Sequence, residues 1–233
     1  NVIIGEGTWV GSNVIIMEGA RIGKNCSIFP GSVISAIPQD LKFNGEDSLV
    51  VINDNTTIRE CVTINRGTSD RGETTIGKNC LIMAYCHVAH DCIIGDNCIF
   101  SNNSTLAGHV SVGNHAILAG FVAVHQFCSI GDHAFIAGGS LVRKDIPPYV
   151  KAAREPISYV GINSVGLRRR GFKASKIQEI QNIYRILFQN KYNNSQAADI
   201  IEAELAATPE RDEILQFIKN SQRGIMKGYF QKN

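Results

Sequence analysis

The chain has 233 residues, of which 44% are apolar, and its formal net charge is +2. This length fits one or two globular domains, and no apolar stretch reaches the length of about 20 residues that a membrane-spanning helix needs. The small net charge, without an aromatic platform or a known binding motif, argues against a nucleic-acid-binding protein.

The first 146 residues carry an apolar side chain at almost every sixth position. From Ile4 to Val142, Ile, Leu, Val or Phe occupies 21 of the 24 positions in this register. A helix has a period near 3.6 and an ordinary strand a period of 2, so a sustained period of six indicates short strands that turn at fixed intervals. We therefore predict a parallel β-helix over residues 1–146, in which residues 18 apart stack at about 4.8 Å.

The three exceptions to this register are acidic residues in polar stretches. They are Asp40, Glu46 and Asp70. These positions predict two loops that interrupt the coils, one near residues 36–51 and one near residues 66–75. Beyond the second loop the register runs unbroken from Ile76 to Val142.

Cysteines fill a second, space-limited column of the repeat, two residues before the apolar position. Six of the seven lie there: Cys26, Cys80, Cys86, Cys92, Cys98 and Cys128. Their spacing differs from the short gaps of a zinc knuckle, so we expect reduced thiols packed as small apolar groups. An odd cysteine count and no secretory segment predict a cytoplasmic protein.

The repeat ends at Asp145-Ile146-Pro147-Pro148, because proline cannot continue a central strand. Residues 147–233 are predicted to form a C-terminal helical domain. A capping box from Ser175 to Gln178 predicts a helix that extends to Leu187, a second helix is expected over 195–207, and a third begins at Thr208 with Pro209 in its first turn. Residues 151–233 hold 14 Lys and Arg against 8 Asp and Glu, a local surplus of +6 that fits an acidic partner.

Four of the six histidines are predicted to gather on one edge of the β-helix. Val88, Leu106 and Val124 are 18 apart, so they stack in successive coils. Four histidines lie within three residues of these positions, and hence within about 10 Å of each other along the edge: His87, His90, His109 and His125. Such a cluster could bind a metal or perform acid–base chemistry.

Two neighbours of this cluster fit acid–base chemistry. Asp91 follows His90 directly, and its carboxylate could hold the imidazole in one tautomer. Gly108 precedes His109, and its backbone N–H could approach a developing oxyanion without hindrance from a side chain. These residues alone name no substrate.

Several ordered motifs make the chain resemble a known family. They are Ile37-Pro38-Gln39-Asp40-Leu41-Lys42, Thr63-Ile64-Asn65-Arg66-Gly67-Thr68, His87-Val88-Ala89-His90-Asp91-Cys92, Leu106-Ala107-Gly108-His109, Ala123-Val124-His125-Gln126-Phe127 and Leu167-Arg168-Arg169-Arg170-Gly171-Phe172. Together they resemble the UDP-N-acetylglucosamine O-acyltransferases of lipid A biosynthesis, over essentially the whole chain.

The resemblance implies a homotrimer of left-handed β-helices with active sites between subunits. It further implies transfer of a (3R)-hydroxyacyl group from acyl carrier protein to the 3-hydroxyl of UDP-N-acetylglucosamine, the first step of lipid A biosynthesis. The acyl group would be carried on the phosphopantetheine of the carrier protein. No other cofactor and no metal are implied.

The resemblance also assigns roles to residues. His90 matches the general base, Asp91 its orienting carboxylate and Gly108 the oxyanion donor. Substrate-binding positions would be Gln39, Asp40, Lys42, His87, His109, His125, Gln126, Asn163, Arg169 and Arg170. Gly138 matches the residue that limits acyl length, and its lack of a side chain predicts donors of twelve or more carbons.

Three alternatives stay open at this point. One is the N-acylating enzyme of the same pathway, which normally carries an additional N-terminal domain. Another is a zinc-dependent trimer of the γ-carbonic anhydrase type, for which tightly bound zinc would be diagnostic. The third is a non-catalytic scaffold, which would need neither the polar loops nor the histidine edge.

Overall fold

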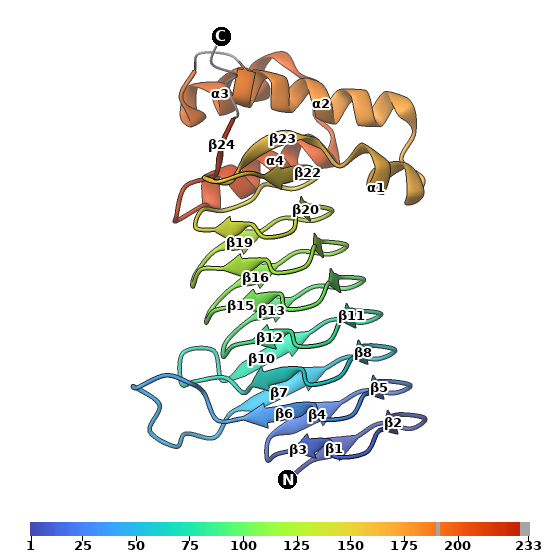
Figure 1. The fold of residues 1–233 in the computed structure, drawn as a ribbon. Coiled ribbons are helices and arrows are strands. Elements are labelled where there is room, and N and C mark those ends of the chain that lie inside the picture. The colour runs from blue at the N-terminus through green and yellow to red at the C-terminus, as the bar shows by residue number, and fades with distance from the viewer. Residues whose placement is uncertain (190–191, 229–233) are drawn as a thin grey trace.

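The computed structural model describes residues 1–189 and 192–228. The first part of the chain winds into a left-handed parallel β-helix with three flat faces, and helices cover its C-terminal end (Figure 1). This confirms the predicted fold class. Within the predicted C-terminal domain of 147–233, residues 190–191 and 229–233 lie outside the described residues.

Each face is one sheet, and its strands run parallel throughout the β-helix; we call the sheets A, B and C in the order in which the chain visits them. Sheet A contains β1 (Ile3–Ile4), β4 (Ala20–Ile22), β7 (Leu49–Ile52), β10 (Glu73–Ile76), β13 (Ile93–Ile94), β16 (Ser111–Val112) and β19 (Ser129–Ile130). Sheet B contains β2 (Trp9–Val10), β5 (Ser27–Ile28), β8 (Thr57–Ile58), β11 (Leu81–Ile82), β14 (Ile99–Phe100), β17 (Ile117–Leu118), β20 (Phe135–Ile136), β22 (Val150–Ala153), β23 (Ser158–Ile162) and β24 (Lys227–Gly228). Sheet C contains β3 (Ile15–Ile16), β6 (Val33–Ala36), β9 (Thr63–Asn65), β12 (His87–Val88), β15 (Thr105–Leu106), β18 (Ala123–Val124) and β21 (Leu141–Val142).

The observed register matches the stacking predicted from the sequence. Val88 lies beside Leu106, and Leu106 lies beside Val124. Ile22, Ile52 and Ile76 are also neighbours in sheet A, although they are 30 and 24 residues apart instead of 18. The two loops therefore add whole multiples of six residues to their coils, and the inward register survives them.

The core is the inside of the prism. The apolar positions from Ile22 to Val142 are buried, and the six column cysteines are free thiols at 0–2% exposure, whereas Cys61 is exposed. This confirms the prediction for the cysteines. Burial raises the pKa of the Cys86 thiol to about 11 and that of Cys92 to about 12, so these thiols stay protonated.

Helices and a β-hairpin cap the last coil. The helices are α1 (Ser164–Arg169), α2 (Ala174–Gln189), α3 (Asn194–Glu204) and α4 (Pro209–Asn220). Three were predicted within a few residues, and Thr208 caps α4 with Pro209 in its first turn, as expected. No helix in the described ranges is long and apolar enough to cross a membrane.

Two features of this end differ from the prediction. The strands β22 and β23 form an antiparallel hairpin that continues sheet B beyond Pro148, so the domain is not purely helical. The predicted capping box at Ser175 is wrong, because α2 begins one residue earlier; a capping box joins Asn193 and Gln196 instead. The sequence pattern did not predict the hairpin, because the pairing of β22 with β20 and β23 follows no repeat period.

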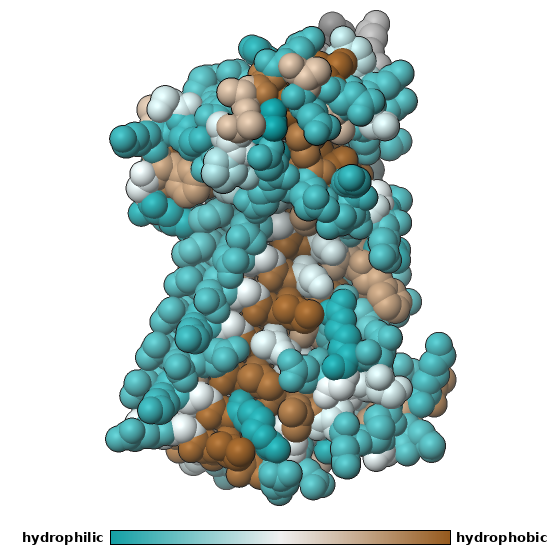
Figure 2. Space-filling model, turned by 180° about the vertical axis from the view of Figure 1, so that it is seen from behind, coloured by the Kyte–Doolittle hydropathy of each residue, from teal (hydrophilic) through white to brown (hydrophobic). Residues whose placement is uncertain are grey.

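A buried carboxylate helps to tie the end of the described chain to the β-helix. Asp145 accepts hydrogen bonds from the backbone N–H of Ser129 at 2.8 Å and from the hydroxyl of Ser221 at 2.6 Å. This links the last coil to the residue after α4. Figure 2 shows an apolar stripe running lengthwise along one face of the prism, between hydrophilic flanks and below the helical end.

Candidate active site

A buried histidine–aspartate pair lies at the corner where sheet C passes into sheet A. His90 Nδ1 lies 2.8 Å from Asp91 Oδ2, and Asp91 is fully buried. Consecutive side chains can meet here because Asp91 has φ +58°, a left-handed conformation that turns the corner. The contact leaves His90 Nε2 as the nitrogen available for proton transfer.

The loop at 66–75 holds the carboxylate of this pair. The backbone N–H of Thr68 donates to Asp91 Oδ1 at 3.0 Å, and its hydroxyl donates to Oδ2 at 2.7 Å. The backbone N–H of Arg71 adds a longer bond of 3.3 Å to Oδ1. Burial opposes ionisation of Asp91, but the hydrogen bonds from His90 and Thr68 outweigh it, so its pKa lies below the usual value.

Gly108 lies directly against the His90 ring. A Cβ added at Gly108 would come within 2.6 Å of His90 Cε1 and Nε2, so only glycine leaves room for the imidazole. Among the described residues, no acceptor receives the backbone N–H of Gly108. A free N–H beside the ring is the arrangement that an oxyanion donor requires.

His109 forms the other wall next to this pair. Its ring meets that of His90 edge-on at 5.0 Å and stacks on Phe127 at 4.4 Å. Its Nδ1 lies 3.1 Å from an oxygen of Asp70, without the alignment of a hydrogen bond. A pocket of about 260 Å³ opens beside it, lined by Asp40, Lys42, Phe43, Glu46, Thr68, Ser69, Asp70, His109 and Phe127.

The remaining residues predicted on this edge lie around the same corner. His87 accepts or donates one hydrogen bond at 2.7 Å with the hydroxyl of Thr63, and burial, with the nearby His90, lowers its pKa. His125 and Gln126 follow β18 one coil above His109, and both are exposed. Gln39 is exposed on the first loop and does not line the pocket.

A second group of predicted residues lies at the corner between sheets A and B. Asn163 caps α1 and donates through Nδ2 to the backbone carbonyl of His133 at 2.9 Å. Arg170 donates to the carbonyl of His115 at 2.9 Å, whereas Arg169 is exposed. These residues fasten α1 to the β-helix, so within one chain they are not gathered with His90.

Gly138 lies at the third corner, in the exposed turn between β20 and β21. A Cβ added there would meet the carbonyl oxygen of Gly120 at 3.2 Å. The predicted site residues are thus divided among all three corners of the prism.

The chain is similar to known proteins over most of its length. Residues 145–226 match the family model "Udp N-acetylglucosamine O-acyltransferase; Domain 2", and residues 1–36 and 73–108 match the model for bacterial transferase hexapeptide repeats. An acyl-(acyl-carrier-protein)–UDP-N-acetylglucosamine O-acyltransferase of Aquifex aeolicus is 52% identical over 84% of this chain and 76% of its own length. The chain belongs to this O-acyltransferase family.

Other relatives agree. The O-acyltransferase of Myxococcus xanthus is 45% identical over 83% of this chain and 76% of its own. Among solved structures, the UDP-N-acetylglucosamine acyltransferase of Bacteroides fragilis superposes with a TM-score of 0.91 at 48% identity, covering 97% of this chain and 94% of that one. The enzyme of Francisella novicida gives 0.95 at 41% identity, covering 97% and 84%. The N-acylating, zinc-lyase and scaffold alternatives do not fit a family of O-acyltransferases.

Three side chains at this site carry ligand atoms that a metal ion could use. One ligand atom each of His90, Asp91 and His109 lies within 4.8 Å of the others. In this O-acyltransferase, however, Thr68, Arg71 and His90 already occupy the Asp91 oxygens. These hydrogen bonds compete with a metal ion for the same carboxylate oxygens.

The sequence analysis missed Thr68 as the support of Asp91. No spacing rule could place it, because it lies on a loop outside the six-residue register. We expect Thr68→Val to lower the free energy of unfolding at pH 7 by about 1–3 kcal/mol, since a buried carboxylate loses a charge-assisted hydrogen bond. Thr68→Ser keeps the hydroxyl and should stay close to the unsubstituted protein.

The loss of stability in Thr68→Val should depend on pH through the ionisation of Asp91. Because the folded pKa of Asp91 lies below the unfolded value of about 3.9, its ionised form stabilises the fold above that value, and this contribution is lost as pH falls through the folded pKa. The cost of Thr68→Val should therefore shrink in denaturant titrations at pH 3. An equal cost at both pH values would contradict the role of the hydroxyl.

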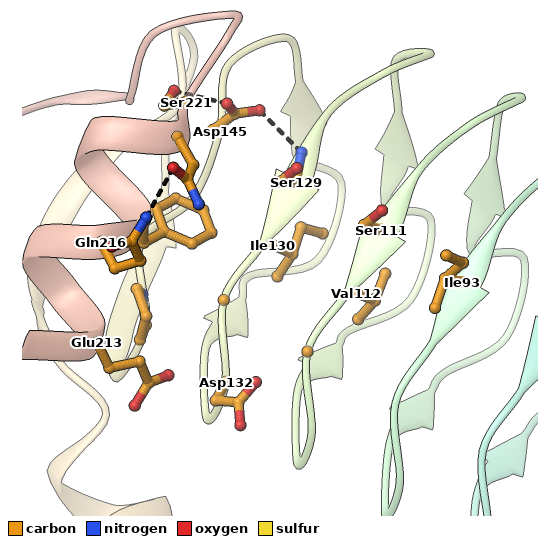
Figure 3. A pocket seen from close by; sticks show the side chains of 15 residues that line it. Ile93, Ser111, Val112, Ser129, Ile130, Asp132, Asp145, Glu213, Gln216 and Ser221 are labelled. Carbon is orange, nitrogen blue, oxygen red and sulfur yellow. Dashed lines mark hydrogen bonds between the residues drawn. The ribbon is translucent and has the colours of Figure 1, made fainter. Parts of the chain in front are cut away.

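A larger pocket of about 450 Å³ lies elsewhere, between α4 and the strands β13, β16 and β19 (Figure 3). None of the predicted site residues lines it. Glu213 faces it and accepts a hydrogen bond from the Tyr149 hydroxyl. Burial and the nearby Asp132 raise the pKa of Glu213 to about 7. Figure 3 also shows Asp145 bonded to Ser129 and Ser221 at the other end of the pocket.

Proposed function

We propose that this protein transfers a (3R)-hydroxyacyl group from acyl carrier protein to the 3-hydroxyl of UDP-N-acetylglucosamine, the first step of lipid A biosynthesis, with His90 as general base. The observation that carries the proposal is the His90–Asp91 pair packed against the unpaired N–H of Gly108. The names of the relatives supply the two substrates. The free cysteines fit the predicted cytoplasmic location.

The geometry supports a direct transfer. His90 Nε2 takes the proton from the sugar hydroxyl as its oxygen attacks the thioester carbonyl, and the Asp91 carboxylate stabilises the resulting imidazolium. The Gly108 N–H donates to the oxyanion of the tetrahedral intermediate. Collapse of the intermediate expels the phosphopantetheine thiolate, which takes the proton back from His90. Six of the seven thiols lie inside the prism, away from this chemistry.

The division of the site residues supports a homotrimer. Asp40, Lys42 and His109 lie near His90, whereas Asn163, Arg170 and Gly138 lie at the other two corners. A neighbouring subunit that presents its corner between sheets A and B to His90 would complete the site with its own Asn163, Arg169 and Arg170. Sedimentation of the intact protein tests the trimer directly.

We further propose that the C-terminal region docks the acidic carrier protein. The surplus of +6 in residues 151–233 gives it a favourable field for such a partner. Reversing the charge of Lys173 and Lys219, both exposed, should raise the KM for the acyl donor and weaken its dependence on salt, with kcat retained. An unchanged salt dependence would contradict docking at these lysines.

The function is tested by acyl transfer from hydroxyacyl carrier proteins of different chain lengths to UDP-N-acetylglucosamine, with a chelator present. We expect chelator-resistant transfer, with a preference for donors of twelve or more carbons because Gly138 adds no side chain. Activity only with ten-carbon donors would contradict the chain-length prediction. No transfer with any donor would contradict the proposed function itself.

A further inference from the structure

The wall of the pocket beside His109 is built from two loops that leave the β-helix at the same corner. The loop between β6 and β7 carries Asp40 and Lys42, and the loop between β9 and β10 carries Thr68 (Figure 1). At their base they are joined by backbone bonds, such as Gly67 N–H to Leu49 O at 3.2 Å. These bonds follow from the coil itself and lie at the roots of the loops.

Near the pocket, a single carboxylate joins the two loops. Glu46, on the first loop, accepts the backbone N–H of Ser69, on the second, at 3.1 Å through Oε1. Its Oε2 accepts the N–H of Asn44 at 2.8 Å, which fixes the side chain to its own loop. These N–H groups and that of Glu46 itself hold the pKa of the carboxyl below its usual value, so it is ionised at neutral pH.

The position of this link matters for both halves of the site. Ser69 follows Thr68, whose hydroxyl and N–H hold Asp91. On the other side, the segment from Asp40 to Lys42 precedes Asn44, and Asp40 Oδ1 accepts the N–H of Lys42 at 2.9 Å. A second contact between the loops, Arg66 over the Phe43 ring at 5.6 Å, has no fixed direction comparable to a hydrogen bond.

We propose that Glu46 is a positioning residue, which latches the two loops together and thereby holds Asp40 and Lys42 at a fixed place relative to His109 and Asp91. The inference rests on the proposed function, and it takes Asp40 and Lys42, which the resemblance gives as substrate-binding residues, to contact the nucleotide sugar. Without the latch, the first loop gains conformations that must be lost again when substrate binds. The dyad keeps its own bonds to Thr68, so binding is affected more than chemistry.

Glu46→Gln is the sharpest test, because it keeps size and shape but presents an NH₂ group to the N–H of either Asn44 or Ser69. We expect the KM for UDP-N-acetylglucosamine to rise about tenfold, the loss that one charge-assisted hydrogen bond represents, with kcat changed less than about threefold. Amide hydrogen exchange should speed up in segments 42–46 and 66–71. Glu73→Gln is the matched control, since Glu73 directly follows the second loop, at the start of β10, and its carboxylate accepts only from Thr75 within the described residues.

Faster exchange together with a raised KM in Glu46→Gln, and neither in Glu73→Gln, supports the latch. Faster exchange with an unchanged KM overturns the positioning role, and unchanged exchange overturns the latch itself. Absence of transfer by the unsubstituted protein contradicts the proposed function. Amide hydrogen exchange in segments 42–46 and 66–71 still tests the latch in that case, because it does not depend on activity.

Discussion

Replacing His90 by alanine should lower kcat for acyl transfer by about 10²–10⁴-fold and leave the KM for UDP-N-acetylglucosamine nearly unchanged. A sugar hydroxyl is a poor nucleophile at neutral pH, and the imidazole held by Asp91 is the base placed to remove its proton. Both residues are buried, and His90 Nδ1 lies 2.8 Å from Asp91 Oδ2, so the free enzyme already holds the ring in position.

Added imidazole separates a chemical role from a structural one. The alanine variant leaves a cavity beside Gly108, and free imidazole that enters it should restore part of the activity, more at higher pH where it is neutral. The thermal midpoint should fall only modestly. A folded variant that keeps at least a tenth of the activity would rule out His90 as the base.

Gly108→Ala should lower kcat by about 10²-fold, because the new methyl group would displace the His90 ring from its reactive position. A Cβ at 2.6 Å from two ring atoms cannot be accommodated without movement. Overpacking of this kind costs about 1–3 kcal/mol of stability as well. The backbone N–H remains in the variant, so the expected loss reports on the ring and not on the oxyanion donor.

The double variant tests this explanation. With His90→Ala in place, the methyl group has no ring to displace, so Gly108→Ala should lower the residual activity less than about twofold. Steady-state rates of the two single variants and the double variant complete the cycle. Fully additive losses would show that Gly108 acts by another route.

Much of the fold could be predicted because each residue of a hexapeptide coil contacts residues at fixed sequence distances. The pairing of Val88 with Leu106 and the burial of Cys92 both follow from counting. The same counting brought His90, His109 and Gly108 to one corner. This counting failed beyond Pro148, where Val150 to Ile162 form a hairpin that the repeat does not predict.

The candidate site could be predicted only where it lies on the repeat. Thr68 and Glu46 lie on loops, and their partners Asp91 and Ser69 are 23 residues away in each case. The position of such side chains depends on how a loop folds back, which no periodicity encodes. The resemblance placed Asp40 and Lys42 near the site but assigned no role to the residues that hold them there.

The period of six was enough to predict the β-helix, the inward cysteines and the histidine edge, because it converts directly into position on a prism. Other contacts became visible only in the folded chain: Asp91 turns back onto His90, Gly108 touches the same ring, and Asn163 and Arg170 lie at a different corner. These contacts depend on left-handed corner residues and on the packing of loops and helices. The corners and the packing depend on where the chain turns in space, which the six-residue repeat does not encode.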